Sequence, residues 1–456
     1  MASEPLPRPG KYFGPPLLVD RRKLEAPGQE RFPIGSPKRA QRGVLRSLGL
    51  GLITGAADDD PSAIGTYASA GAAFGPALLW MVPLVYPMMF TVAYLCGKVG
   101  QATGQGLFAI IRQYYPRAVL YFLLITALIG NVIEAGADLG GMAAALNMLV
   151  PIPIGAIVVM VALIILVLQI WTSYKTIRDI FRWLALVLLA YVGSAILARP
   201  DWRDAIRATF VPHIEFTKEY LSMVVAIIGA SLSAYIYSWQ SNVEVEEQID
   251  NGRRRLDDRS GAPSKEEVRI AARDIAFGMF FANLIVYFTL LSTAATLHRA
   301  GKTDISTAAD AAQALRPLAG NAAGFLFAIG LVGVGFLAVP VMTTGAAYDL
   351  CQTFGCRHGL HWKASEAKMF YGAIVIFTAL GIGMNFLGIN PIKALVYAGV
   401  VQGVSTPFLT LIVMLINRNR RIMGDLVNRP AMNALGWLTT GVMFAASIGL
   451  LVTLFK

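Results

Sequence analysis

The chain is a series of long apolar runs separated by short polar stretches. A transmembrane helix needs about twenty consecutive, mainly apolar residues, and runs of this kind recur along most of the 456 residues. By run length we predict about eleven spans. They lie near residues 44–70, 76–98, 118–149, 152–173, 178–198, 220–241, 274–297, 320–350, 368–388, 391–416 and 433–455. The pattern therefore predicts an all-α polytopic membrane protein.

The first span is interrupted by charge. Residues 49–75 are rich in small apolar side chains but contain Asp58, Asp59 and Asp60, followed by Pro61, at mid-length. Burying a carboxylate in hydrocarbon costs at least about 2.5 kcal/mol, so the cluster needs a partner, and a divalent cation is the simplest one. Proline also disfavours helical geometry in the residue before it, and such broken helices coordinate ions in secondary transporters. The alternative is that the three Asp residues cap, at the membrane edge, a helix that starts near Pro61.

The sixth span resembles the first in design. Residues 223–242 carry small polar groups at their centre, among them Gly229, Ser231 and Ser233. Two polar, glycine-interrupted spans that lie five helices apart indicate inverted repeats of five spans each, with the substrate site between the two broken helices. A helix-packing face would give the sixth span the same composition. We predict repeat one at 44–198, repeat two at 220–416, and an extra helix at 433–455.

The third span also contains polar groups. Asn131, Glu134 and Asp138 follow i, i+3, i+7 spacing and share one helical face. Carboxylates inside a span are functional candidates by default, so these residues extend the ion pathway, carry protons, or bond to a neighbouring helix. Gln402 and Asn385 offer neutral oxygens, although a single amide in a span more often makes a helix–helix contact.

Composition and charge agree with a membrane location. The chain is 55% hydrophobic and 15% charged, whereas soluble domains carry about 25% charged residues. The net charge of +11 does not indicate nucleic-acid binding, because the basic residues lie in loops. With a cytoplasmic N-terminus these loops face inward, as the positive-inside rule requires. We therefore expect a multi-pass protein of the plasma (inner) membrane, with a disordered basic tail at 1–42 and one transporter domain at 43–456.

Signatures of other chemistry are absent or weak. The sequence contains no phosphate-binding GxxxxGK[ST] loop and no HExxH or Ser–His–Asp pattern, so we expect no enzyme activity, no cofactor and an ion gradient as any energy source. Segment 243–273 is expected to be a solvated connector. Four residues of the 351–361 segment have ligand types that bind zinc, but their spacing and basic neighbours favour a plain loop. These four are Cys351, Cys356, His358 and His361.

Four stretches of the chain resemble motifs of the Nramp family of divalent metal transporters. Asp60-Pro61-Ser62-Ala63 stands where the family has Asp-Pro-Gly-Asn, and Ala137-Asp138-Leu139 stands where it has Thr-Asp-Leu. Residues 327–350 and the RRIMGDLVN stretch at 420–428 match further motifs in the same order. The resemblance extends over the chain from Gly43 onward. It implies a LeuT-like fold of two inverted five-helix repeats, with helices 1 and 6 broken.

The resemblance also implies a metal site. In the family, the ion is held by the Asp and Asn of the first span and by a carbonyl and a Met sulfur from the sixth. Carried over here, Asp60 binds the cation, Asp59 shares the site or its hydration shell, and the Ala230 carbonyl is the backbone ligand. Ala63 stands at the Asn position.

Two further positions depart from the family's pattern. Ser233 replaces the Met and Tyr235 replaces a conserved His, and we expect both to contact water around the ion. An oxygen-lined, water-rich site suits Mg²⁺, which keeps several waters, and this pattern is similar to the Nramp-related magnesium transporter branch. The family's Glu after the third-span Asp corresponds to Gly141, so the proton relay is incomplete.

The resulting hypothesis is alternating-access transport of partly hydrated Mg²⁺, and of Mn²⁺, without obligatory proton cotransport. Asp138, Glu134, Asn131 and Gln402 are expected to line the route. One alternative is a proton-coupled importer of Mn²⁺ or Fe²⁺. A sodium-coupled amino-acid symporter would share the architecture, but an Asp cluster would repel the carboxylate of its substrate. A membrane sensor that uses segment 243–273 is the third alternative. The sequence leaves the oligomeric state and the direction of flux open.

Overall fold

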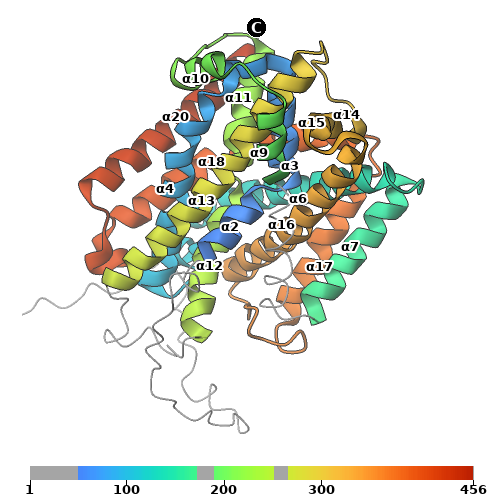
Figure 1. Ribbon diagram of the computed structural model, residues 1–456. Helices are drawn as coiled ribbons and strands as arrows, with labels where there is room; N and C mark the ends of the chain where they lie inside the picture. Colours follow the sequence, from blue (N-terminus) through green and yellow to red (C-terminus); the bar gives the residue numbers. More distant parts are fainter. Residues whose placement is uncertain (1–49, 172–188, 251–264, 455–456) are drawn as a thin grey trace, which may run out of the picture.

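The structure, a computed structural model, describes residues 50–171, 189–250 and 265–454 (Figure 1). Every regular element within these ranges is helical. The α-helices are α2 (Leu50–Asp58), α3 (Pro61–Phe74), α4 (Met81–Thr103), α5 (Leu107–Tyr114), α6 (Arg117–Asn147), α7 (Ile154–Trp171), α9 (Leu189–Leu197), α10 (Trp202–Phe210), α11 (Lys218–Ser231), α12 (Ala234–Asp250), α13 (Lys265–Thr293), α14 (Ala308–Ala312), α15 (Arg316–Ala319), α16 (Ala323–Phe354), α17 (Lys368–Met384), α18 (Pro391–Arg418), α19 (Arg420–Met423) and α20 (Pro430–Leu454). Single turns of 3₁₀-helix lie at Gly75–Leu78, Gln313–Leu315, Gly320–Ala322 and Gly424–Leu426, and a π-turn lies at Ala294–His298.

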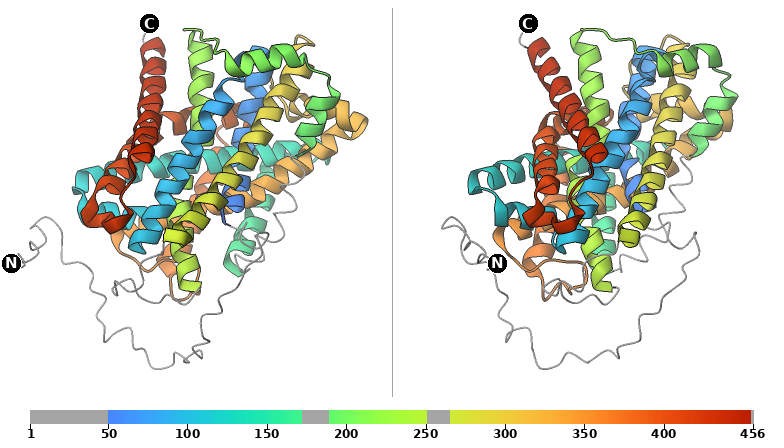
Figure 2. Two further views of the ribbon diagram at one scale, coloured as in Figure 1. Left: turned by 60° about the vertical axis from the view of Figure 1, so that its left-hand side comes forward. Right: turned by 90° about the vertical axis from the view of Figure 1, so that its left-hand side faces the viewer.

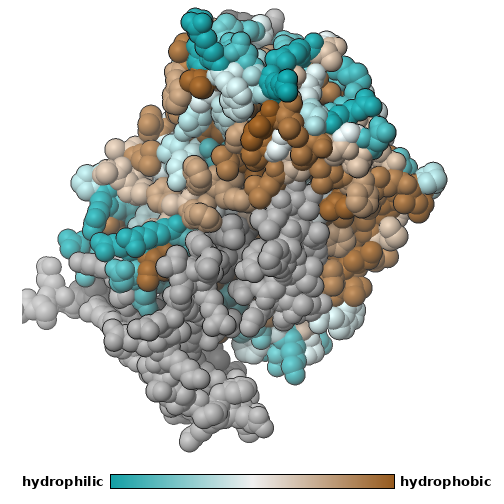
Figure 3. All heavy atoms as spheres, in the orientation of Figure 1, coloured by the Kyte–Doolittle hydropathy of each residue, from teal (hydrophilic) through white to brown (hydrophobic). Residues whose placement is uncertain are grey.

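The surface of the bundle is that of a multi-pass membrane protein. Eight helical segments of the described residues are long and apolar enough to cross a membrane. Large apolar side chains are exposed on the outer helices, such as Ile125 of α6, Leu163 of α7 and Ile376 of α17. Figure 3 shows hydrophobic residues over the middle and right of one face, with hydrophilic residues gathered at the top. The prediction of an all-α polytopic membrane protein is confirmed.

Two helices of the bundle are broken at mid-length. The first divides into α2 and α3 at Asp59–Asp60, and the sixth divides into α11 and α12 at Leu232–Ser233. Each break falls where the sequence predicted it. The other predicted spans correspond to α4, α6, α7, α13, α16, α17, α18 and α20; α13 begins nine residues before its predicted start, and the other ends differ by five residues or fewer. Of the fifth span, 178–198, only the part forming α9 lies within the described residues.

Small residues allow the broken helices to approach their neighbours closely. A Cβ atom added to Gly229 of α11 would lie 1.8 Å from the carbonyl oxygen of Gly399 in α18, so only glycine fits there. Gly55 of α2 meets the Gly278 carbonyl of α13 in the same way, at 2.2 Å. Such small-residue contacts replace the hydrophobic effect as the means of helix association in a bilayer. Both views of Figure 2 show α13 alongside α4 in this bundle, and the two helices are in contact.

The structure corrects the prediction for segment 243–273. Helix α12 continues to Asp250 and α13 begins at Lys265, so both ends of the predicted connector are helical, and its remaining part, 251–264, lies outside the described residues. Glu244 and Gln248 are buried and not solvated. Gln101 of α4 donates to Glu244 Oε2 at 2.8 Å, and Gln248 donates to the Gln101 carbonyl at 3.3 Å. The polar composition of 243–250 therefore reflects pairing with another helix. The predicted tail at 1–42 also lies outside the described residues.

Candidate functional site

Asp60 occupies the break in the first helix and is fully buried. Its Oδ1 atom accepts hydrogen bonds from the backbone N–H of Ala63 at 2.7 Å and from Ser62 Oγ at 2.7 Å, so Asp60 is the N-cap of α3. The Tyr235 hydroxyl lies 3.2 Å from Oδ2 and 2.9 Å from the Ala57 carbonyl oxygen. The helix cap of the alternative interpretation is thus present, but it lies inside the bundle.

A second carboxylate, that of Glu134 on α6, lies beside Asp60. Ser233 Oγ donates to Glu134 Oε1 at 2.5 Å, and Gln402 Nε2 donates to Oε2 at 2.7 Å. Ser62 Oγ is 3.2 Å from Oε1, so one serine bridges the two carboxylates. Sequence reasoning placed Glu134 along the route, whereas the structure brings it to the site. The sequence did not identify Ser62 as a residue of the site, because its only distinguishing feature was a small polar side chain directly after Pro61.

The break in the sixth helix exposes backbone groups to the same place. In a continuous helix the Ala234 N–H would bond to the Ala230 carbonyl. Here it donates to Gln402 Oε1 at 3.1 Å, and Ser233 Oγ turns back to the Gly229 carbonyl at 2.9 Å. The Ala230 carbonyl therefore loses its regular helical partner, as expected of a backbone ligand. Gln402 also approaches Asn131 Oδ1, at 3.5 Å, which places Asn131 at the edge of this network.

Three further carboxylates are buried around the break without full hydrogen bonding. Both oxygens of Asp59 and of Asp138 lack a partner, as does one oxygen of Asp58. Asp138 is fully buried and lies within electrostatic range of Asp60 and Glu134. Among the described residues, no ion pair includes any of these acids. Buried polar groups are nearly always satisfied, so this concentration of negative charge requires protons or a cation.

The side-chain atoms of the site that could coordinate a metal ion are all oxygens. Asp60 and Glu134 supply carboxylates, Ser62, Ser233 and Tyr235 supply hydroxyls, and Ala63 contributes only its N–H, to Asp60. In the part of the chain that the structure describes, no three His, Cys, Asp or Glu side chains are placed to hold a metal ion by themselves. A cation bound here would therefore complete its shell with hydroxyl, amide and carbonyl oxygens and with water, as Mg²⁺ and Ca²⁺ do.

The other candidates from the sequence have structural surroundings of their own. Asn385 donates to the Gly136 carbonyl at 2.8 Å, which is the helix–helix contact expected of a lone amide. Cys351 is buried within α16, while His358 and His361 lie in the loop that follows. His361 Nδ1 lies 2.8 Å from Glu246 Oε2 of α12, and His358 Nδ1 lies 2.8 Å from the Cys356 carbonyl oxygen.

The sequence profile of the Nramp family, described as natural resistance-associated macrophage protein-like, matches residues 51–453. This chain belongs to the Nramp family. It is 29% identical over 414 residues to the divalent metal cation transporter MntH of Deinococcus radiodurans, and the match covers 89% of each protein. The family resemblance predicted from the four motifs is confirmed, and the protein is a divalent metal transporter of this family.

Solved structures share the fold of this Nramp chain. A manganese transporter of Eremococcus coleocola, in complex with an aromatic bis-isothiourea compound, superposes with a TM-score of 0.69 at 19% identity, over 89% of this chain and 85% of that one. MhsT in complex with L-phenylalanine superposes with a TM-score of 0.54 at 13% identity, over 89% and 98%. The LeuT-like architecture with two broken helices is therefore confirmed.

Proposed function

We propose that this Nramp protein imports a divalent metal ion, with Mn²⁺ as the first candidate, through the site where its two broken helices meet. The observation that carries the proposal is the pair of buried carboxylates, Asp60 and Glu134, bridged by Ser62 and lacking any basic partner among the described residues. A divalent cation would neutralise both charges. The names of the similar proteins, a divalent metal cation transporter and a manganese transporter, support Mn²⁺ and favour the alternative of a Mn²⁺ or Fe²⁺ importer.

Each residue of the site has a role in this proposal. Asp60 and Glu134 bind the cation directly, and the Ala230 carbonyl completes the protein ligands. Ser233 and Tyr235 orient water in the coordination shell. Asp59 adds negative charge close to the ion, while Ala63 leaves space for water where a larger side chain would stand. The buried polar residues of α6 and α18 line the route, and these are Asp138, Asn131 and Gln402.

Mg²⁺ is the second candidate, because the described donors include no sulfur. A Met thioether favours soft transition metals, whereas carboxylate, carbonyl and water suit both Mn²⁺ and Mg²⁺. Mg²⁺ in particular is held by one or two carboxylates and keeps several waters. The small side chains of Ala63 and Ser233 are compatible with such a hydrated ion.

Competition for uptake into proteoliposomes separates the two candidates. Purified protein takes up Mn²⁺, and the rate is measured while external Mg²⁺ is raised. If Mn²⁺ is the selected cargo, a large excess of Mg²⁺ leaves the Mn²⁺ rate unchanged. If Mg²⁺ is carried as well, it competes in proportion to its concentration. Mn²⁺ flux equal to that of protein-free liposomes would refute the proposal.

Proton coupling has its own test. Gly141 and Tyr235 stand where relay residues were expected, which motivated the hypothesis of uncoupled transport. Glu134, however, places a carboxyl group of the third span at the site, so a residue that can carry a proton lies beside the proposed ion. Liposomes loaded with a pH-sensitive dye decide the question. Acidification of the lumen on addition of Mn²⁺ supports coupling, and a constant signal during measurable Mn²⁺ uptake supports the uncoupled hypothesis.

A further inference from the structure

A line of polar residues leads away from the cation site between α12 and α16. Tyr235, Ser238 and Asn242 follow i, i+3, i+7 spacing on α12, so they share one face of the helix. Tyr235 contacts Asp60, and Ser238 contacts Asp349 of α16. One turn further on, Gln352 of α16 donates to Asn242 Oδ1 at 2.5 Å. The seam, as we name this line of residues, extends from the site toward one end of the molecule.

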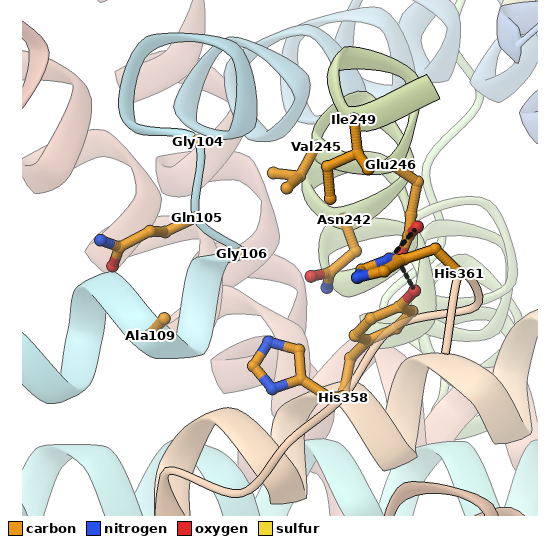
Figure 4. Close-up of a pocket in the computed structure, with 11 residues that line it drawn as sticks. Gly104, Gln105, Gly106, Ala109, Asn242, Val245, Glu246, Ile249, His358 and His361 are labelled. Carbon is orange, nitrogen blue, oxygen red and sulfur yellow. Dashed lines mark hydrogen bonds and ion pairs between the residues drawn. The ribbon is translucent and has the colours of Figure 1, made fainter. Parts of the chain in front are cut away.

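The seam ends at a cavity of about 280 Å³. Asn242 lies on the seam and also lines the cavity. Glu246 of α12 and the two histidines of the loop after α16, His358 and His361, line the cavity as well. Figure 4 shows Asn242 and Glu246 projecting from α12 toward the loop that carries His358 and His361. Burial lowers the pKa of the His358 imidazole from its ordinary value, so this ring is neutral at pH 7 and does not repel a cation. Glu246 adds a carboxylate at the mouth of the seam.

Asp349, midway along the seam, is the one buried carboxylate there, and the site described above does not use it. It is fully buried, and its two oxygens both lie 2.6 Å from Ser238 Oγ. One hydroxyl has a single hydrogen, so it satisfies only one of these oxygens. No ion pair within the described ranges includes Asp349. An isolated charge buried inside the membrane bundle is costly. If Asp349 is ionised, its carboxylate therefore requires a cation beside it.

We propose that Asp349 and Ser238 form a second binding station for the transported cation, between the Asp60 site and the cavity. This inference rests on the proposed function. The station offers three oxygens to a partly hydrated divalent ion. Gly345, one turn before Asp349, leaves the space of one methyl group next to Ser238, because an added Cβ would lie 3.7 Å from Ser238 Cβ and from the Tyr235 carbonyl oxygen. Conduction along a pathway needs sites that bind an ion yet release it to the next, and a station with one carboxylate meets this requirement.

The basic residues near the cavity indicate which side of the membrane the seam faces. Arg112 reaches the Gln352 carbonyl at 3.5 Å, and Arg357 lies in the loop beside the cavity. By the positive-inside rule we expect this end to be cytoplasmic. The station would then bind the ion after it leaves Asp60 and before it enters the cytoplasm.

The test compares purified wild-type protein with Asp349→Asn, which removes the charge and keeps the shape. Bound Mn²⁺ is counted by electron paramagnetic resonance, and Mn²⁺ uptake is measured in proteoliposomes. We expect Asp349→Asn to lose one of the ions bound by wild type and to lower the maximal rate about tenfold with little change in KM, because the Asp60 site is intact. Glu244→Gln is the matched control. Glu244, on α12, is buried like Asp349, but its oxygens accept hydrogen bonds from Gln101 and Gln240. It should behave as wild type in both assays.

The outcomes separate this inference from the proposed function. Wild-type stoichiometry and rate in Asp349→Asn would overturn the second station, and so would a change confined to proton movement in the pH-dye assay. Unchanged transport by Asp60→Asn would overturn the proposed function itself. If Asp349→Asn fails to fold, as judged by its elution profile and Tm, Ser238→Ala and Gly345→Leu replace it. Loss of the second ion in Ser238→Ala and a reduced rate in Gly345→Leu are then the expected results, and wild-type behaviour of both contradicts the station.

Discussion

The two helix breaks that form the site differ in what they supply. The first carries charge, with Asp60 at its centre and Asp58 and Asp59 just before it, and Pro61 marks it. The second, at Leu232–Ser233, has neither an acid nor a proline and supplies a hydroxyl and backbone groups that are released from regular helical hydrogen bonding. One repeat therefore provides the attraction for a cation, and the other provides neutral oxygens.

The breaks also differ in how their backbone ends are satisfied. The N-terminus of α3 is capped by its own Asp60, with Pro61 in the first turn, which is a locally encoded arrangement. A bound cation must share Asp60 with these cap bonds. The break between α11 and α12 is instead completed from a distance, because Gln402 of α18 accepts from Ala234. This leaves the C-terminal end of α11, the negative end of its dipole, open toward a cation. The comparison predicts that changes at the first break weaken transport more than changes at the second.

Asp60→Ala should have the largest effect and reduce Mn²⁺ uptake to the level of protein-free liposomes. The substitution removes the carboxylate that is proposed to bind the ion at the N-terminus of α3, and Ser62 and Tyr235 lose the acid that they contact there. Uptake into proteoliposomes measures the effect. Asp425→Ala, which changes an exposed acid, is the control and should transport normally. Substantial uptake by Asp60→Ala would show that charge at the first break is dispensable.

Glu134→Gln should come next, with a loss of affinity for Mn²⁺ of at least about 100-fold, because removing a group that only supports a ligand already costs about 10- to 100-fold and Glu134 is proposed to bind the ion itself. The amide keeps the size of the side chain and retains one acceptor oxygen for Ser233 or Gln402. Calorimetric titration of the purified variant measures the affinity. An affinity within twofold of wild type would place Glu134 outside the site.

Ser233→Met should change selectivity more than rate. A thioether at the second break favours softer ions, so we expect Cd²⁺ uptake to rise relative to Mg²⁺ uptake by about tenfold. Uptake of each ion is measured in parallel, with Ser365→Met in the exposed loop after α16 as the control. An unchanged ratio would mean that the second break does not select the ion.

Tyr235→Phe should have the smallest effect. It removes a hydroxyl that contacts Asp60 and the Ala57 carbonyl, and the loss of one such hydrogen bond costs about 1 kcal/mol, or about fivefold in affinity. Titration with Mn²⁺ checks the value. A loss of affinity as large as that of Asp60→Ala would show that the second break contributes as much as the first and would remove the distinction between them.

Local sequence patterns were sufficient for much of this structure. The apolar runs predicted the helices, and the Asp-Pro sequence at 60–61 predicted the first break, because proline and buried charge act on the residues next to them. The small polar centre of residues 223–242 predicted the second break. Polar spacing failed at 243–250, where Glu244 and Gln248 were interpreted as solvated but pair with α4. A polar side chain looks the same in sequence whether water or another helix satisfies it.

The sequence by itself determined the membrane class, the positions of the helices, the two breaks and the family, since all of these depend on runs of neighbouring residues. Only the tertiary structure decided that Glu134 belongs to the site, that Ser62 bridges it to Asp60, and that Asp349 lies on a seam leading away from it. These facts depend on contacts between residues far apart in the chain, such as Ser233 with Glu134 and Gln402 with Glu134. Helix packing brings such faces together, and a pattern read along one helix does not contain the identity of the helix opposite.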